Sequence, residues 1–80
     1  MVTVTFSPDF RKSFKKIKSQ QIKSKIIKQI QKIKSNPDIG KPMRYIRKGT
    51  RELYIPPYRL SYIKINDDVE ILDLYHKDKQ

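Results

Sequence analysis

Arg59 is the residue of this chain whose type and setting point most directly to chemistry. It lies just inside Tyr58–Ile65, a stretch rich in tyrosine, isoleucine and leucine, which is typical of a strand. A strand is a rigid mount, and a guanidinium held on one is well suited to bidentate binding of a phosphate group. The alternative is a surface arginine that flanks the turn expected at Pro56 and Pro57.

The charge of the chain predicts a polyanionic partner. Its 80 residues include 19 Lys and Arg against 8 Asp and Glu, which gives a formal net charge of +11. Such an excess attracts DNA, RNA or an acidic protein. Cysteine is absent and His76 is the single histidine, which argues against a disulfide framework and a zinc centre. We therefore expect neither a metal nor a cofactor.

The hydropathy of the chain does not predict a membrane protein. No apolar run approaches the length of a membrane span, and the first residues lack the apolar core of a signal peptide. These features predict a cytoplasmic protein with no membrane partner. The length is sufficient for one domain over residues 1–80, with a modest core.

The first half of the chain predicts one strand and two helices. Residues 2–6 alternate apolar and polar side chains, as a strand does. Ser7 is suited to cap a helix that runs to about Lys18, and a second helix is predicted over Gln20–Ser35. Isoleucines recur along one side of the second helix, and lysines occupy the other. Pro37 is expected to end it.

The second half predicts three or four strands on short turns. Residues 51–55 and Tyr58–Ile65 form a hairpin around two prolines, and residues 69–75 form the last strand. A further short strand is expected at residues 44–47. Strands joined by short turns are antiparallel. The chain therefore predicts an α+β fold, with an N-terminal strand and a two-helix hairpin packed on a mainly antiparallel sheet of four or five strands.

The order and motifs of these elements resemble the RelE/ParE superfamily of toxins from toxin–antitoxin systems. The resemblance rests on an E-L-x-I run from Glu52, a Y-R-L-x-Y run from Tyr58 and a V-x-I-L run from Val69, which follow a basic helical hairpin. It covers nearly the whole chain and is stronger toward the RelE branch. Members of that branch are ribosome-dependent endoribonucleases that cut mRNA in the ribosomal A site. They are silenced by a cognate antitoxin, so the resemblance implies a RelB-like partner as well.

The resemblance also implies catalytic roles. RNA cleavage by its own 2′-hydroxyl needs a base, cations on the phosphate and a proton donor, and it requires no metal. Arg59 matches the superfamily's central arginine, whose implied role is to bind the scissile phosphate. Glu52 is implied as the base and His76 as the general acid. Lys77 matches the basic residue that often follows the last strand.

Simpler roles remain open for two of these side chains. Glu52 is otherwise a surface carboxylate paired with Arg51 or Arg47, and His76 is otherwise a solvent-exposed residue of the tail. Many members carry a later tyrosine that orients the substrate, and this sequence has none after Tyr75.

RNA-binding residues are implied in two groups. The tyrosines near the proposed site are expected either to stack on a base or to pack in the core, and they are Tyr54, Tyr58 and Tyr75. The basic residues before and at the start of the hairpin are expected to contact ribosomal RNA or the message backbone, and they are Lys41, Arg44, Arg47, Lys48 and Arg51.

Two other functions fit the same sequence. A toxin of the ParE branch binds DNA gyrase through the same fold and cleaves no RNA. A basic nucleic-acid-binding module would instead use the lysines of the helices, such as Lys23, Lys28 and Lys32. In that case the loss of those charges abolishes function, whereas the loss of Arg59 does not.

Overall fold

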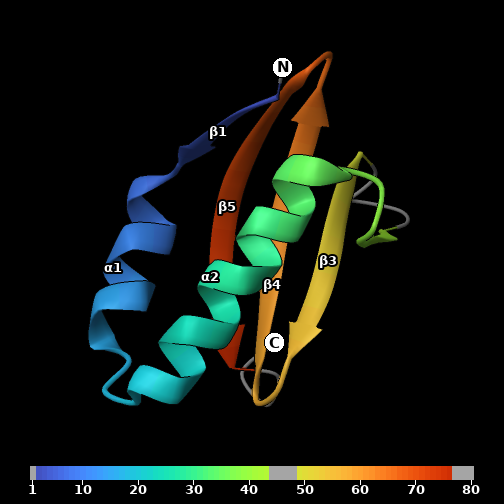
Figure 1. Ribbon diagram of the computed structural model, residues 1–80. Coiled ribbons are helices and arrows are strands. Elements are labelled where there is room, and N and C mark those ends of the chain that lie inside the picture. Colours follow the sequence, from blue (N-terminus) through green and yellow to red (C-terminus); the bar gives the residue numbers. More distant parts are fainter. Residues whose placement is uncertain (1, 44–48, 77–80) are drawn as a thin grey trace.

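The computed structural model describes residues 2–43 and 49–76, so the strand predicted at residues 44–47 lies outside them. The predicted order of one strand, two helices and further strands is confirmed (Figure 1). No helix within these two ranges is long and apolar enough to cross a lipid bilayer. The elements are β1 (Thr3–Phe6), α1 (Pro8–Lys16), α2 (Gln20–Ser35), β2 (Lys41–Pro42), β3 (Thr50–Ile55), β4 (Tyr58–Ile65) and β5 (Asp68–His76).

Both helices begin at a serine cap, Ser7 for α1 and Ser19 for α2. The Ser7 Oγ accepts a hydrogen bond from the backbone N–H of Phe10 at 3.1 Å. This bond satisfies one of the N–H groups that a helix start leaves without an intrahelical partner. α1 ends at Lys16, slightly short of the prediction, because Ile17 adopts an extended conformation and is buried.

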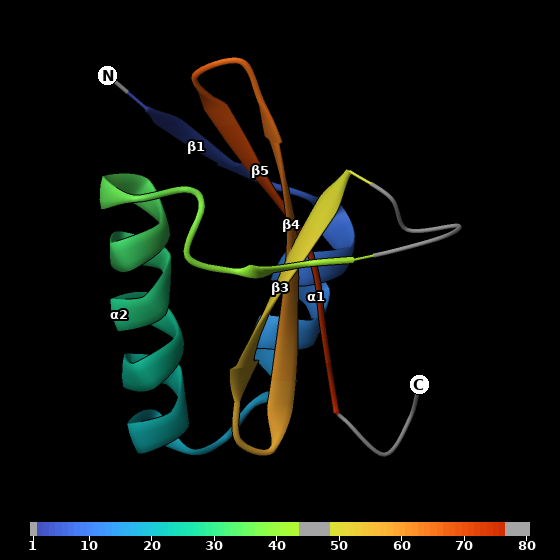
Figure 2. The same cartoon turned by 90° about the vertical axis from the view of Figure 1, so that its right-hand side faces the viewer.

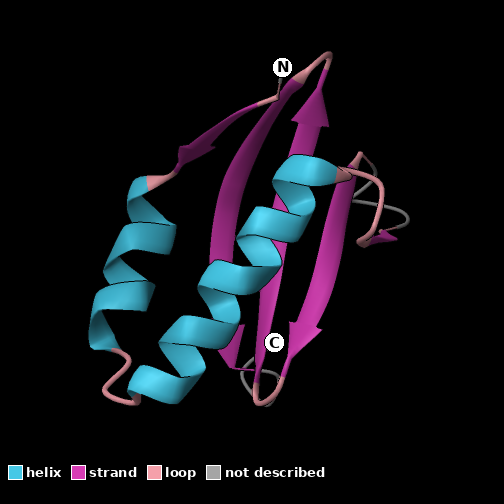
Figure 3. Ribbon diagram, in the orientation of Figure 1, coloured by secondary structure: helices cyan, strands magenta, loops and turns pink. Residues whose placement is uncertain are grey.

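The strands form one sheet in the order β1-β5-β4-β3-β2 (Figure 3). The pairs β5–β4, β4–β3 and β3–β2 are antiparallel, so the mainly antiparallel sheet is confirmed. β1 pairs with β5 in parallel. A parallel pair needs a long crossover, and here the helices and the other strands lie between β1 and β5 in the chain.

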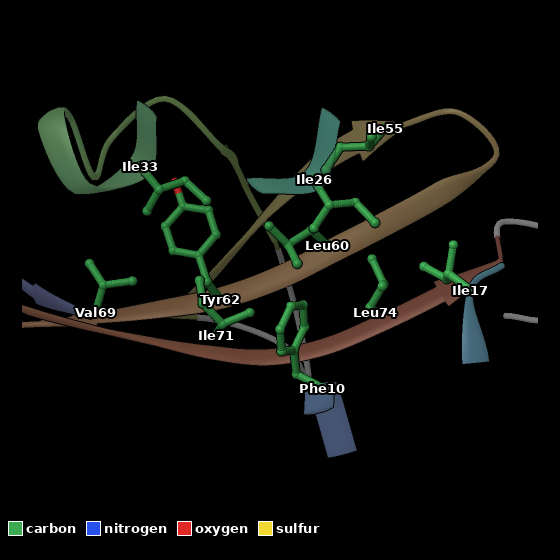
Figure 4. Packing of buried hydrophobic residues seen from close by; sticks show 10 residues of the cluster. All are labelled: Phe10, Ile17, Ile26, Ile33, Ile55, Leu60, Tyr62, Val69, Ile71 and Leu74. Carbon is green, nitrogen blue, oxygen red and sulfur yellow. The ribbon is translucent and has the colours of Figure 1, made fainter. Parts of the chain in front are cut away.

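The register of the strands divides the sheet into two faces. Residues paired directly across strands share a face, so Leu53, Leu60 and Leu74 lie together. α2 lies over this face, and α1 lies beside the β5 edge of the sheet, so neither helix covers the opposite face (Figure 1 and Figure 2). The core forms between this face and the helices (Figure 4), and its buried members are Phe10, Ile17, Ile26, Ile33, Ile55, Leu60, Tyr62, Val69, Ile71 and Leu74.

Tyr62 ties the connection after α2 to the sheet. Its ring is fully buried, and its hydroxyl donates to the carbonyl of Pro37 at 2.7 Å and accepts from the N–H of Gly40 at 2.8 Å. A Cβ at Gly40 would lie 2.6 Å from this hydroxyl, so the close approach requires glycine. Burial raises the pKa of Tyr62. Arg51 adds a hydrogen bond to the Gly40 carbonyl at 2.8 Å and an ion pair with Asp38 at 3.5 Å.

A β-bulge in β5 changes which side chains face the helices. Tyr62 pairs with Ile71, while the residue before it pairs with Asp73, so Leu72 is an extra residue in the strand. Plain alternation from Ile71 would place Tyr75 on the helix side of the sheet. The bulge turns Tyr75 to the opposite face instead.

Candidate active site

Arg59 lies in a row of three side chains on neighbouring strands. It pairs with Tyr54 of β3 and with Tyr75 of β5, so all three lie on the face that no described helix covers. The hairpin itself brings Tyr54 and Arg59 together, because the two residues are equally distant from the connection at residues 56–57. The next residue, Leu60, is fully buried in the core, so Arg59 points away from it.

Glu52 of β3 forms an ion pair with Arg59. The guanidinium Nη1 donates to the carboxylate Oε1 at 2.9 Å. The side chain of Glu52 is 7% exposed and that of Arg59 is 38% exposed, so the carboxylate is held below the surface and the guanidinium reaches it. The hydroxyl of Tyr75 donates to the other carboxylate oxygen, Oε2. The hydrogen bond to Glu52 raises the pKa of Arg59, which therefore keeps its positive charge.

Arg59 keeps hydrogen-bonding capacity beyond this ion pair. A guanidinium carries five N–H donors. The bond to Glu52 uses Nη1, and the side chain is 38% exposed, which leaves other donors within reach of a ligand. The Nε itself is buried and has no hydrogen-bond partner in the described part of the chain. The ring of Tyr54 lies 5.6 Å from the Arg59 Cζ, within the range of a cation–π contact. The site therefore presents an oriented cation, flanked by two tyrosines, which is suited to bind an anion.

Tyr58 and His76 lie together on the other face of the sheet. The two residues pair across β4 and β5, and their rings meet edge to face at 5.7 Å. Tyr58 is half-buried and packs against the core. His76 directly follows Tyr75, and the alternation of the strand separates its side chain from that of Arg59.

The basic residues expected near the site are divided by position. Arg51 lies on the helix side of the sheet, where it contacts Asp38 and Gly40. The alternative of a surface Glu52 paired with Arg51 is therefore wrong, since Glu52 is buried and pairs with Arg59. Lys41 is exposed and pairs with Glu52 in the β2–β3 register. The remaining candidates lie outside the described residues, and they are Arg44, Arg47, Lys48 and Lys77.

Comparison with known proteins places the chain in a family. A family sequence model described as "ParE toxin of type II toxin-antitoxin system, parDE" matches residues 4–80. The chain belongs to this family. It is a toxin of a type II toxin–antitoxin system, and the RelE/ParE resemblance predicted from its motifs is confirmed. Among curated proteins, none matches the sequence.

Solved structures share the toxin's fold in both branches of the superfamily. The RelBE2 toxin–antitoxin complex of Mycobacterium tuberculosis matches at 26% identity and a TM-score of 0.82, over 94% of this chain and 96% of that chain. The isolated RelE toxin of E. coli matches at 15% identity and a TM-score of 0.82, over 98% of this chain and 86% of that chain. The chromosomal ParDE system of P. aeruginosa matches at 13% identity and a TM-score of 0.78, over 95% of this chain and 96% of that chain. The fold is therefore shared by RelE-named and ParE-named structures.

Two features of the toxin's site escaped the sequence analysis. The first is the row of Tyr54, Arg59 and Tyr75, although the equal spacing about the prolines was a signal for its first pair. The second is the bulge in β5. Its signal in the sequence is that the apolar residues of the strand lie at odd-numbered positions up to Ile71 and at even-numbered positions after it. The described residues hold no group of three or more His, Cys, Asp and Glu that could bind a metal ion.

Proposed function

We propose that this toxin is a ribosome-dependent endoribonuclease that cleaves mRNA in the ribosomal A site. The observation that carries the proposal is the outward-facing guanidinium of Arg59, held on a strand by Glu52 and flanked by Tyr54 and Tyr75. An oriented cation beside an exposed aromatic ring, that of Tyr54, suits an RNA strand, whose phosphates bind cations and whose bases stack on rings.

Arg59 has a defined part in the proposed reaction. The RNA 2′-hydroxyl attacks the adjacent phosphorus and gives up its proton to solvent water. The bond to the departing 5′-oxygen breaks as that oxygen takes a proton from His76 or Lys77, and a 2′,3′-cyclic phosphate remains. Negative charge grows on the phosphate oxygens during attack, and a preorganised donor stabilises that charge more than it stabilises the ground state. Loss of one such donor costs about 100-fold or more in rate.

Proton transfer is assigned to the end of the last strand. His76 and Lys77 are proposed there, because a donor to the 5′-oxygen must lie within reach of the phosphate that Arg59 binds. His76 lies one residue beyond Tyr75 but faces the other side of the sheet in the free toxin, so a backbone rearrangement at the end of β5 is part of the proposal. Glu52 could act as the base only by releasing a hydrogen bond from Arg59 or Tyr75.

Tyr54 is the proposed stacking platform for a base. Its side chain is 52% exposed, whereas that of Tyr75, the other tyrosine described on this face, is only partly exposed. Contacts to ribosomal RNA and to the message backbone are proposed for Arg44, Arg47 and Lys48, whose charges lie just before β3 in the sequence. Arg51 could join them only by releasing its contacts with Asp38 and Gly40.

A cognate antitoxin is the proposed inhibitor, and an apolar groove between α1 and α2 is its proposed seat. The groove has a volume of about 790 Å³ and is lined by residues of β1, α1 and α2, whereas Arg59 projects from the face that these helices leave open. Its floor and rim suit an amphipathic helix with acidic residues at its edges. The lining residues are Phe6, Phe10, Phe14, Ile27 and Ile30, with Arg11, Lys12, Lys15 and Gln31. The RelBE2 and E. coli RelBE structures are toxin–antitoxin complexes, which supports a RelB-like partner here.

A second candidate function is inhibition of DNA gyrase. The matching family description names ParE toxins, and the ParDE fold of P. aeruginosa resembles this one. The two functions separate when one toxin preparation is tested in a reconstituted translation reaction and in a gyrase supercoiling assay. The endoribonuclease is expected to stop translation at concentrations that leave supercoiling unchanged. Inhibited supercoiling with intact translation would assign the toxin to gyrase instead.

A further inference from the structure

Glu52 is a carboxylate with an unusual setting for an acidic group on a sheet surface. Its side chain is 7% exposed, and both oxygens accept hydrogen bonds, Oε1 from Arg59 and Oε2 from Tyr75. A buried carboxylate persists only when a cation and hydrogen bonds compensate the loss of its hydration. The partners are therefore part of what keeps Glu52 in place, and Glu52 in turn constrains them.

The same contacts define the orientation of Arg59. A free arginine side chain samples many rotamers, and each productive contact must overcome that entropy. Here Nη1 is held at 2.9 Å from Glu52 and the ring of Tyr54 lies 5.6 Å from Cζ, while the side chain stays 38% exposed. One side of the guanidinium is fixed to the protein, and donors remain for an anion.

We infer, on the basis of the proposed endoribonuclease function, that Glu52 and Tyr75 are positioning residues for Arg59. The Tyr75 hydroxyl orients the Glu52 carboxylate, and the carboxylate fixes the guanidinium so that its other donors meet the scissile phosphate. Preorganised donors act best when neighbouring groups lock their rotamers. Glu52 acts through Arg59 in this arrangement and takes no proton from the RNA.

Isosteric and truncating variants of Glu52 distinguish positioning from general base catalysis. Glu52→Gln keeps an oxygen for Arg59 but cannot accept the 2′-hydroxyl proton, whereas Glu52→Ala removes the contact. Message cleavage is measured in a reconstituted translation reaction at saturating ribosome concentration. We expect a loss of at most about 3-fold for Glu52→Gln and of about 10-fold or more for Glu52→Ala. A general base contributes about 100-fold or more, so a loss of that size in Glu52→Gln overturns the inference.

A double-variant cycle tests whether Glu52 acts through Arg59. In the Arg59→Ala background, Glu52→Ala is expected to cause no further loss, because the group that it positions is absent. Additive losses would contradict the inference. Glu70→Ala is the matched control, since Glu70 is an exposed glutamate on β5. It is expected to cleave at the wild-type rate.

Tyr75→Phe separates positioning from base stacking. The variant keeps the ring and loses the hydroxyl that donates to Glu52. We expect a loss of about 3-fold or more in the wild-type background and none beside Glu52→Ala. A Tyr75→Phe toxin with the wild-type rate would remove Tyr75 from the positioning pair.

Nuclear magnetic resonance of the free toxin tests the inference without any RNA. The Nε–H signal of Arg59 is expected to be resolved and slow to exchange in the wild type and in Glu52→Gln, and to exchange rapidly in Glu52→Ala. Equal exchange rates in all three proteins would overturn the positioning role. If the wild type cleaved no message, the proposed function would fail, and this spectrum alone would decide whether Glu52 orients Arg59.

Discussion

Two arginines of this toxin show how one sheet separates structural from exposed polar groups. Arg51 and Arg59 come from adjacent strands but project from opposite faces. Arg51 binds Asp38 and the Gly40 carbonyl and thereby holds the connection after α2. Arg59 pairs with Glu52 on the face that no described helix covers. The same residue type therefore stabilises the fold in one place and is available to a ligand in the other.

Tyr62→Phe is expected to lower the free energy of unfolding by about 1–3 kcal/mol at pH 8. The substitution leaves the Gly40 N–H and the Pro37 carbonyl without their partner. Chemical denaturation with urea measures the change. An unchanged unfolding midpoint would show that these two hydrogen bonds contribute nothing.

The same tyrosine predicts a loss of stability at high pH. Its pKa is raised in the folded toxin by burial, so on titration the unfolded chain releases this proton first, above about pH 10. The unfolded state then binds fewer protons than the folded state, and stability falls as the pH rises. Urea unfolding between pH 8 and pH 11 is expected to show a steeper fall for the wild type than for Tyr62→Phe. Parallel curves would contradict the prediction.

The sequence could predict the type of residue at the site better than its surroundings. Arg59 followed from one strand and its composition, and the pairing with Tyr54 could have followed from the symmetric hairpin. The burial of Glu52 could not be predicted, because it depends on contacts with Arg59 and Tyr75, which come from two other strands. The faces of Tyr75 and His76 also depend on a bulge whose position the local composition only marks.

Among the elements, α1 and β5 are joined at the bulge by a single serine. The Ser7 N–H donates to the carbonyl of Ile71 at 2.9 Å, and its hydroxyl donates to the carbonyl of Leu72, the extra residue of the bulge. The same hydroxyl oxygen accepts the capping hydrogen bond from Phe10. The start of α1 therefore helps to fix the bulge that turns Tyr75 toward Arg59.

Ser7→Ala is expected to destabilise the toxin by about 2 kcal/mol, because it removes both a helix cap and a hydrogen bond to the bulge. Ser19→Ala is the matched control, since Ser19 caps α2 through an exposed hydrogen bond of 3.3 Å. Its expected cost is about 0.5–1 kcal/mol. Urea unfolding of both variants measures the difference, and equal costs would mean that the contact with Leu72 is not stabilising.

The helices and the hairpin were accessible from the sequence because their signals are local. Apolar periodicity and capping serines marked α1 and α2, alternation marked β3, and a composition rich in tyrosine, isoleucine and leucine marked β4. The parallel pairing of β1 with β5 could not be predicted from the sequence, because it joins residues more than 60 positions apart (Thr3 with Asp68). The short β2 also escaped, since Lys41–Pro42 has no strand-like composition and is defined by its register with β3.

For the molecule as a whole, the positive charge is concentrated in the helical layer. Ten of the 19 basic residues and no acidic residue lie between positions 10 and 37, whereas residues 38–80 contain nine basic and seven acidic ones. The helical layer is therefore strongly cationic and the sheet is close to neutral. Long-range attraction to a polyanion therefore acts mainly on the helices, whereas the proposed phosphate-binding residue, Arg59, lies on the other side of the sheet.

Substitution of three exposed lysines on one stripe of α2 tests this charge distribution. Lys25, Lys28 and Lys32 to Ala in combination is expected to weaken binding to a single-stranded RNA oligonucleotide. The slope of log affinity against log salt is expected to fall by about 2, at about 0.7 per phosphate contact. Fluorescence anisotropy over a salt series measures it, and Arg59→Ala is expected to change the slope by less than one. An unchanged slope in the triple variant would show that these lysines of α2 do not contact the RNA.

Primer extension on a message in a reconstituted translation reaction is the most direct test of the proposed activity. Wild type, Arg59→Ala and Lys64→Ala are compared, since Lys64 is a basic residue of the same strand on the helix side of the sheet. We predict ribosome-dependent cuts within codons for wild type and Lys64→Ala, and a loss of about 100-fold or more for Arg59→Ala. The absence of cuts with wild type, or equal cutting by Arg59→Ala, would contradict catalysis by this site.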